Sequence, residues 1–148
     1  MSGILKWPLI VAAVVVVLRV FAERAGAPNA VSNMLSVVAL HTLIGPIYFA
    51  MRIGKALEPR PYLTLIKLIA LYAVATRAMV LPTYWLARIF EWPESRFNGL
   101  WGPGVSPLMG FIALPFATAA FWIVASLVAG GAIGAATLAI LRSTKQPR

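Results

Sequence analysis

The chain has 148 residues, of which 61% are hydrophobic and only 11% are charged, and its formal net charge is +9. A water-soluble domain has roughly a quarter of its residues charged, so this composition predicts an integral membrane protein and excludes the soluble enzyme classes. The absence of cysteine excludes disulfide frameworks, thiolate metal sites and iron–sulfur ligation.

Four apolar segments are long enough to cross a bilayer, which takes about 20 helical residues. We predict spans at residues 4–22, 31–51, 62–86 and 107–141. The connections between them are too short to be domains, so residues 1–148 are expected to form a single polytopic domain. The predicted fold class is an all-α integral membrane protein with four transmembrane helices.

The first segment has an alternative interpretation as a signal peptide, because its apolar run is followed by small residues at 25–27. Arg19, Glu23 and Arg24 lie between that run and the small residues, where a cleaved leader rarely carries charge. We therefore expect a retained span.

In the second segment, His41 is the only histidine of the chain and lies near the middle of the span. Even a neutral imidazole carries a donor and an acceptor that hydrocarbon cannot satisfy, so His41 is a candidate functional residue. Tyr48, on the same helical face, or a backbone carbonyl could satisfy it, and the alternative is a cofactor such as haem, chlorophyll or quinone. Pro46 cannot donate to the carbonyl of Thr42, which predicts a kink close to His41.

In the third segment, Arg77 lies roughly 12 Å below the predicted outer interface, at a helical rise of 1.5 Å per residue. Charged groups at such depth nearly always pair, and no acidic residue lies inside any predicted span. Three partners stay open: a loop glutamate folded inward, an anionic lipid or cofactor group, and an acid on another subunit. The carbonyl of Ala78, which Pro82 leaves without a helical donor, could also accept from the guanidinium. His41, Tyr48 and Arg77 are the predicted cofactor-binding residues.

The segment at residues 88–106 is dense in aromatic residues, glycine and proline, and we expect it to form an outer loop at the membrane surface. Trp92 and Trp101 can place their amphipathic rings at headgroup level. The alternative is that they form a docking site for a partner.

Three prolines, at positions 103, 107 and 115, lie just before or near the start of the fourth segment, so we expect a broken entry segment followed by a regular helix from about residue 116 to residue 141. Ser126, Gly130 and Gly134 fall four residues apart and form a ridge of small side chains. Such a ridge lets a second helix approach closely, either within the chain or from a neighbouring subunit.

The basic residues are distributed unevenly, with eight on the face that holds both termini, four on the opposite face and one inside a span. Lys and Arg collect on the cytoplasmic side, so this pattern predicts that both termini lie in the cytoplasm. The same bias explains the positive charge without nucleic acid binding. The bacterial inner membrane is the default location.

No intramembrane carboxylate, metalloprotease motif, phosphate-binding loop or nucleophile elbow is found, so we do not expect an enzyme. Our first hypothesis is a non-catalytic accessory subunit of a larger membrane complex, such as a respiratory or photosynthetic one, with the bilayer and other membrane subunits as partners. The alternative is a self-contained protein that binds a quinone, a tetrapyrrole or a lipid. A small transporter or membrane enzyme ranks third.

Overall fold

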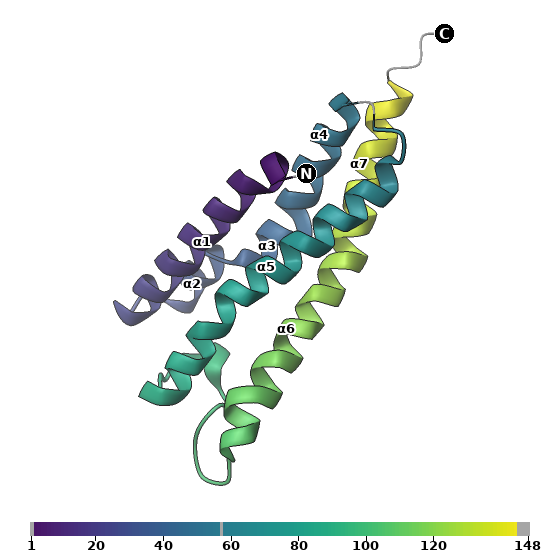
Figure 1. The fold of residues 1–148 in the computed structure, drawn as a ribbon. Coiled ribbons are helices and arrows are strands. Elements are labelled where there is room, and N and C mark those ends of the chain that lie inside the picture. Colours follow the sequence, from purple (N-terminus) through teal and green to yellow (C-terminus); the bar gives the residue numbers. More distant parts are fainter. Residues whose placement is uncertain (1, 57, 145–148) are drawn as a thin grey trace.

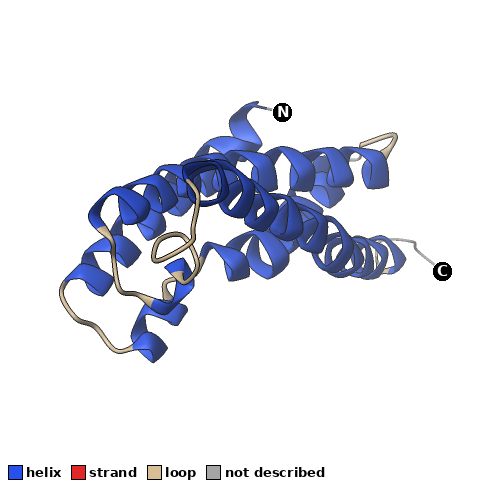
Figure 2. Cartoon of the chain, turned by 90° about the horizontal axis from the view of Figure 1, so that it is seen from below, coloured by secondary structure: helices blue, strands red, loops and turns tan. Residues whose placement is uncertain are grey.

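The structure is a computed structural model that describes residues 2–56 and 58–144. Within these ranges the regular elements are all helices, without a strand, and loops join the helical stretches (Figure 2). Four helical stretches are long and apolar enough to cross a membrane: Gly3–Arg24, Asn29–Ala56, Pro61–Phe90 and Met109–Ser143. The four predicted segments are therefore confirmed as helices, and every predicted end lies within five residues of the observed one.

The helices alternate in direction (Figure 1). Helix α1 (Ser2–Arg24) begins at the end where α4 and α7 finish, and we call this the terminal end. The opposite end carries the loop of residues 91–108, and we call it the loop end. Helix α5 (Pro61–Phe90) is central, because 44% of the residues in its most apolar 18-residue stretch are buried. The corresponding share for α1 is 6%.

The second stretch is irregular. It consists of α2 (Asn29–Met34), α3 (Val37–Ala39), a π-helical turn at Leu40–Ile44 and α4 (Gly45–Ala56). The kink expected near His41 takes the form of this π turn, in which the amide of Gly45 donates to the carbonyl of Leu40. A break separates α2 from α3, and Ser36 caps α3 by accepting from the amide of Val38 at 3.2 Å. This break was not predicted from the sequence.

The fourth stretch consists of a π-helical turn at Met109–Ala113, α6 (Leu114–Ala125), a second π-helical turn at Ser126–Gly130 and α7 (Gly131–Ser143). Regular α-helix begins at Leu114, within two residues of the predicted start, after an irregular π-helical entry turn. The prediction of a regular helix from there to residue 141 is wrong, because the second π-helical turn interrupts it. Pro115 leaves the carbonyl of Phe111 without its α-helical donor. The indole Nε1 of Trp85 donates to this carbonyl at 2.9 Å and so replaces the missing bond.

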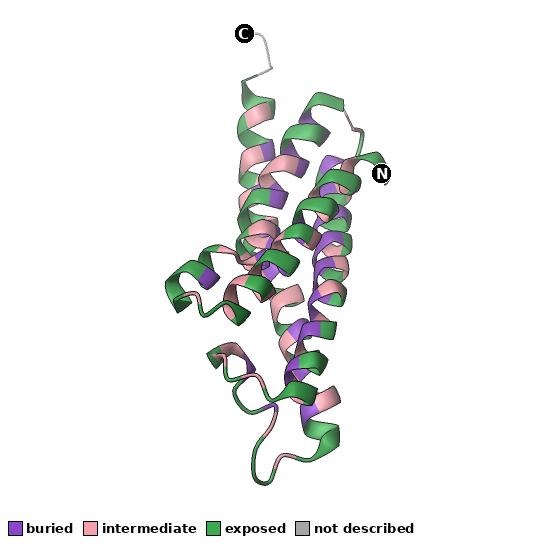
Figure 3. Cartoon of the chain, turned by 90° about the vertical axis from the view of Figure 1, so that its left-hand side faces the viewer, coloured by how far each residue is buried: buried purple, intermediate pink, exposed green. Residues whose placement is uncertain are grey.

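The main apolar core lies toward the terminal end, where α1, α4, α5 and α7 meet. Its buried members are Ala12, Phe49, Ala50, Ile53, Leu65, Leu68, Ile69, Tyr72 and Leu138. Exposed residues lie along the outward faces of the helices (Figure 3). Many of them are large hydrophobic residues, as in helices of membrane-spanning length and composition.

The ridge of small residues faces the interior of the chain. A Cβ atom on Gly130 would lie 2.8 Å from Pro46 Cγ, and one on Gly134 would lie 3.1 Å from Leu65 Cδ2. The glycines therefore permit close contact of the fourth stretch with α4 and α5, which is the intrachain arrangement of the two that the sequence left open.

Candidate functional site

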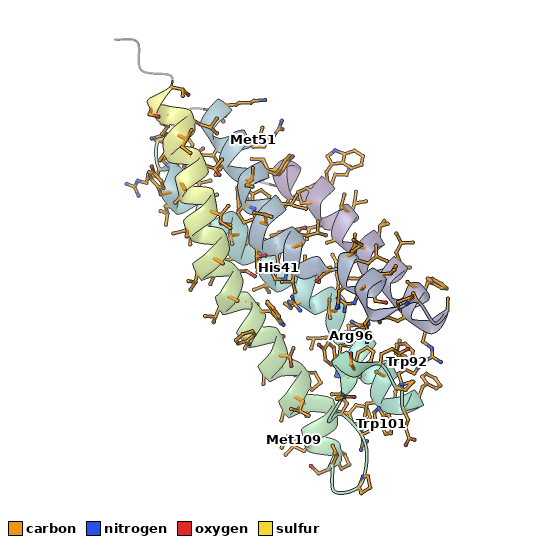
Figure 4. The ribbon with its side chains drawn as sticks, turned by 180° about the vertical axis from the view of Figure 1, so that it is seen from behind. His41, Met51, Trp92, Arg96, Trp101 and Met109 are labelled. Atoms are coloured by element: carbon orange, nitrogen blue, oxygen red, sulfur yellow. The ribbon has the colours of Figure 1, made fainter. Side chains whose placement is uncertain are left out.

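Three polar side chains from three different spans meet in the interior of the bundle. His41 and Ser126 are fully buried, and Arg77 is only 5% exposed. Arg77 Nη2 contacts His41 Nε2, Ser126 Oγ contacts His41 Nδ1, and Ser126 Oγ donates in turn to the carbonyl of Trp122. Figure 4 labels His41 near the middle of the long axis, remote from both ends.

The direction of each hydrogen bond in this cluster follows from the donors available. A guanidinium can only donate, so Nε2 of His41 accepts and the ring proton lies on Nδ1. Nδ1 then donates to Ser126, whose hydroxyl proton goes to the carbonyl of Trp122. His41 is therefore a neutral imidazole with both nitrogens engaged, and neither is free to ligate a haem or a chlorophyll while these contacts hold.

The local backbone explains why His41 and Ser126 meet. Each lies in a π-helical turn, at Leu40–Ile44 and Ser126–Gly130, and such turns redirect the side chains that follow them. Gly130 lets the two turns approach, because a Cβ atom there would lie 3.1 Å from the carbonyl oxygen of His41.

Tyr48 does not belong to this cluster, although it was predicted to share a face with His41. The prediction assumed an unbroken α-helix, in which residues seven apart lie nearly one above the other. The π turn adds about one residue to the register, or roughly 100° of rotation, between His41 and Tyr48. Tyr48 instead packs edge-on against Phe49, with ring centroids 5.7 Å apart.

Arg77 has a hydrogen-bond partner that was not among the candidates. Neither a loop glutamate nor the carbonyl of Ala78 accepts from it, and its described partner is His41. The guanidinium also lies over the indole of Trp122, with Cζ 5.5 Å from the ring centroid. Because His41 is neutral, this contact satisfies a donor and leaves the charge of Arg77 uncompensated.

A cavity of about 340 Å³ adjoins the cluster, and we call it the arginine cavity. Its walls are formed by α1, the second stretch, α5, α6 and the loop of residues 91–108. Its polar lining residues are Arg19, Asn33, Ser36, Arg77, Tyr84 and Arg96. No acidic residue is among the described lining residues. Nε of Arg77 and Nε of Arg96 are buried and have no hydrogen-bond partner in the described part of the chain.

One carboxylate near the cavity serves two of its three arginines. Glu23 Oε1 lies 2.9 Å from Arg19 Nε, and Glu23 Oε2 lies 2.7 Å from Arg96 Nη2. Burial lowers the pKa of Arg96 from its usual value, and the charge of Glu23 opposes that change. A guanidinium nevertheless stays protonated in proteins, so three positive charges face one negative charge.

The loop of residues 91–108 positions Arg96 by folding back onto the end of the bundle. Phe97 is fully buried, and Arg24 Nη1 lies 3.1 Å from Glu94 Oε1, which ties α1 to the loop. The Nε1 of Trp101 donates to the carbonyl of Trp92 at 3.2 Å, and both indoles are half-buried (Figure 4). The sequence did not single out Arg96, Arg19 or Trp122 as site residues, because only the fold of the loop and the helix contacts bring them to the cavity.

Comparison of the chain with protein-family models, with curated proteins and with solved structures finds no match. No group of three or more metal-ligating side chains is found among the described residues. What the arginine cavity offers is unpaired guanidinium donors and excess positive charge inside an apolar bundle.

Proposed function

We propose that this chain is a multi-pass membrane protein that binds an anionic group, a phosphate or a carboxylate, in the arginine cavity. The observation that carries the proposal is the convergence of three guanidinium groups on a cavity whose described lining includes no carboxylate, with Glu23 shared between two of them. An uncompensated charge in a medium of low dielectric constant is costly unless an opposite charge approaches it. A bound anion would supply that charge and would accept from the unpartnered Nε atoms of Arg77 and Arg96.

The distribution of charge supports a topology with both termini in the cytoplasm. The described basic residues at the terminal end are Lys6, Arg52, Lys55, Arg60, Lys67 and Arg142, against the single acid Glu58. Those at the loop end are Arg19, Arg24, Arg88 and Arg96, against Glu23, Glu91 and Glu94. Because basic residues are retained on the cytoplasmic side, the loop end would face outward and the arginine cavity would lie in the outer half of the bilayer.

The site geometry favours a binding protein over an accessory subunit. Two of the observations behind the accessory hypothesis were the absence of a partner for Arg77 in the sequence and the ridge of small residues that includes Gly130 and Gly134. Arg77 contacts His41 and a cavity of its own chain, and the ridge contacts Pro46 and Leu65. The accessory role stays a prediction. A neutral quinone would leave the charge of Arg77 uncompensated, so an anion is the better ligand.

The test uses the purified chain in a neutral mild detergent. Calorimetric titration with dihexanoyl phosphatidylglycerol is compared with titration with dihexanoyl phosphatidylcholine, because these lipids differ in headgroup charge and have short chains. We expect binding of the anionic lipid alone, and Arg77→Gln should weaken it by about tenfold or more, the loss of one charge-assisted contact.

Lys67→Gln is the matched control, because Lys67 lies on the same helix, is exposed and does not line the cavity. It should bind as the unaltered chain does. Equal binding of both lipids, or unchanged binding in Arg77→Gln, would contradict the proposal.

A further inference from the structure

The contact between His41 and Arg77 holds the arginine without neutralising it. A guanidinium has five N–H donors, and Arg77 uses one of them in its contact with Nε2 of His41. No ion pair of Arg77 is found among the described residues. The contact therefore restricts the side chain and leaves its positive charge available to a ligand.

The imidazole of His41 is itself held in one orientation. Its Nδ1 donates to Ser126 Oγ, and Ser126 Oγ donates to the carbonyl of Trp122. His41 and Ser126 are fully buried, so these hydrogen bonds do not compete with bulk water. The acceptor atom Nε2 is thus presented to Arg77 from a fixed position.

The indole of Trp122 contacts both members of the His41–Arg77 pair. It lies edge-on to the imidazole, with ring centroids 6.5 Å apart and an interplanar angle of 69°. The guanidinium lies over the same indole, with Cζ 5.5 Å from the ring centroid. Arg77 is therefore confined by a hydrogen-bond acceptor and by an aromatic face, beside the cavity that Arg77 and Trp122 both line.

The neutral state of the acceptor matters for anion binding. A carboxylate at position 41 would form an ion pair with Arg77 and remove the charge that attracts a ligand. An arginine without any acceptor would keep its charge but would lose conformational freedom when an anion binds, which weakens binding. A neutral acceptor that is fixed in place avoids both losses.

From this arrangement we infer that His41 is a positioning residue of the anion site, a neutral acceptor that fixes the guanidinium of Arg77 for the ligand. Ser126 acts through His41, because it fixes the tautomer and the orientation of the imidazole. The inference rests on the proposed function, since it requires that Arg77 binds an anion. It goes beyond that function by assigning a role to two buried residues that do not line the arginine cavity.

The test compares two substitutions of nearly equal shape at position 41. His41→Gln keeps a neutral acceptor for Arg77 and a donor for Ser126, whereas His41→Glu adds a negative charge. Binding of dihexanoyl phosphatidylglycerol is measured by calorimetric titration in a neutral mild detergent. The free energy of unfolding of each variant is measured by chemical unfolding in the same detergent.

We expect His41→Gln to bind within about threefold of the unaltered protein. His41→Glu should bind more weakly by about tenfold or more, because its carboxylate neutralises Arg77. It should nevertheless be at least as stable as His41→Gln, since the ion pair compensates a buried charge. A purely structural role of His41 would not lower binding while stability is kept.

Two outcomes would separate the inference from the function on which it rests. Equal binding by His41→Gln and His41→Glu, with the unaltered protein binding the lipid, would overturn the inference and leave the anion site standing. Absence of phosphatidylglycerol binding by the unaltered protein would contradict the proposed function, and the inference with it.

A second comparison tests the role of Ser126. Ser126→Ala removes the acceptor of Nδ1 and should weaken binding by about threefold, the loss of one hydrogen bond behind His41. Thr76→Val is the matched control, because Thr76 is fully buried next to Arg77, donates only to carbonyls of its own helix and does not line the cavity. It should bind as the unaltered chain does. Equal binding by Ser126→Ala and Thr76→Val would overturn the role of Ser126.

Discussion

The two ends of the bundle are built from the same helices but differ in what fills them. At the terminal end, α5 places Leu65, Leu68 and Ile69 in a dry core with Phe49 and Leu138. Two turns further along, the same helix buries a threonine and an arginine beside a cavity. The apolar core that holds the helices together and the polar groups that can bind a ligand therefore lie at different levels along the bundle.

The irregular parts of the second stretch lie near the polar cluster and the arginine cavity, not in the apolar core at the terminal end. The break before Ser36 and the π turn at Leu40–Ile44 lie beside the arginine cavity, whereas α4 runs as a regular helix through the dry core. Regular helices with small residues pack closely, as Gly134 does against Leu65. Irregular turns leave space and redirect polar side chains into it.

The largest effect is expected where the two ends differ most, in the charge network. Glu23→Gln would leave Arg19 and Arg96 without their shared carboxylate, whose side chain is only 6% exposed. We expect a loss of about 3 kcal/mol in the free energy of unfolding, as for breaking a buried pair. Chemical unfolding in detergent measures it, with Glu91→Gln, at an exposed helix end, as the control.

Anionic lipid sharpens that prediction. It should stabilise Glu23→Gln more than it stabilises the unaltered protein, because it supplies the missing negative charge. Equal stabilisation of the two proteins would show that the lipid does not approach these arginines.

A smaller effect is expected from a cavity in the dry core. Leu68→Ala should cost about 2 kcal/mol, toward the low end for large-to-small substitutions because lipid is itself apolar and mainly packing is lost. Leu68 is fully buried. The loss in the free energy of unfolding should be the same with and without anionic lipid. A strong lipid dependence would contradict the separation of core packing at the terminal end from ligand binding at the arginine cavity.

A steric test compares two adjacent glycines. Gly130→Ala should cost about 1–2 kcal/mol because its methyl would crowd Pro46 and the carbonyl of His41. Gly131→Ala meets nothing within 4 Å and should be neutral or slightly stabilising. Thermal unfolding of the two variants in one detergent would check this, and equal unfolding temperatures would contradict the intrachain packing of the ridge.

The smallest effect is expected at the exposed ion pair of the loop end. Arg24 is 47% exposed, and an ion pair this open contributes about 0–1 kcal/mol. Arg24→Gln should therefore change unfolding little and leave lipid binding intact, since Arg24 does not line the arginine cavity. A loss as large as that of Glu23→Gln would show that the whole loop, rather than the cavity, responds to charge.

The helices could be predicted from sequence because bilayer thickness fixes their length and composition. His41 and Arg77 stood out because a polar group at that depth is unusual. Their mutual contact could not be predicted, since it joins residues 36 apart on different helices and is not a pair of opposite charges. Tyr48 was misplaced because a π turn leaves no clear signal in hydrophobic periodicity, and Arg96 was missed because a loop folds it inward.

The most direct test of the anion site is the distance between lipid phosphorus and arginine nitrogen, measured by ³¹P–¹⁵N dipolar recoupling with ¹⁵N-arginine protein in bilayers that contain one phosphatidylglycerol per chain. We predict guanidinium signals within about 4 Å of phosphorus, the separation of a charge-assisted hydrogen bond to phosphate, and their loss in Arg77→Gln. Recoupling that Arg77→Gln leaves unchanged would place the phosphate on exposed arginines such as Arg52 and Arg60, and would contradict a site in the arginine cavity.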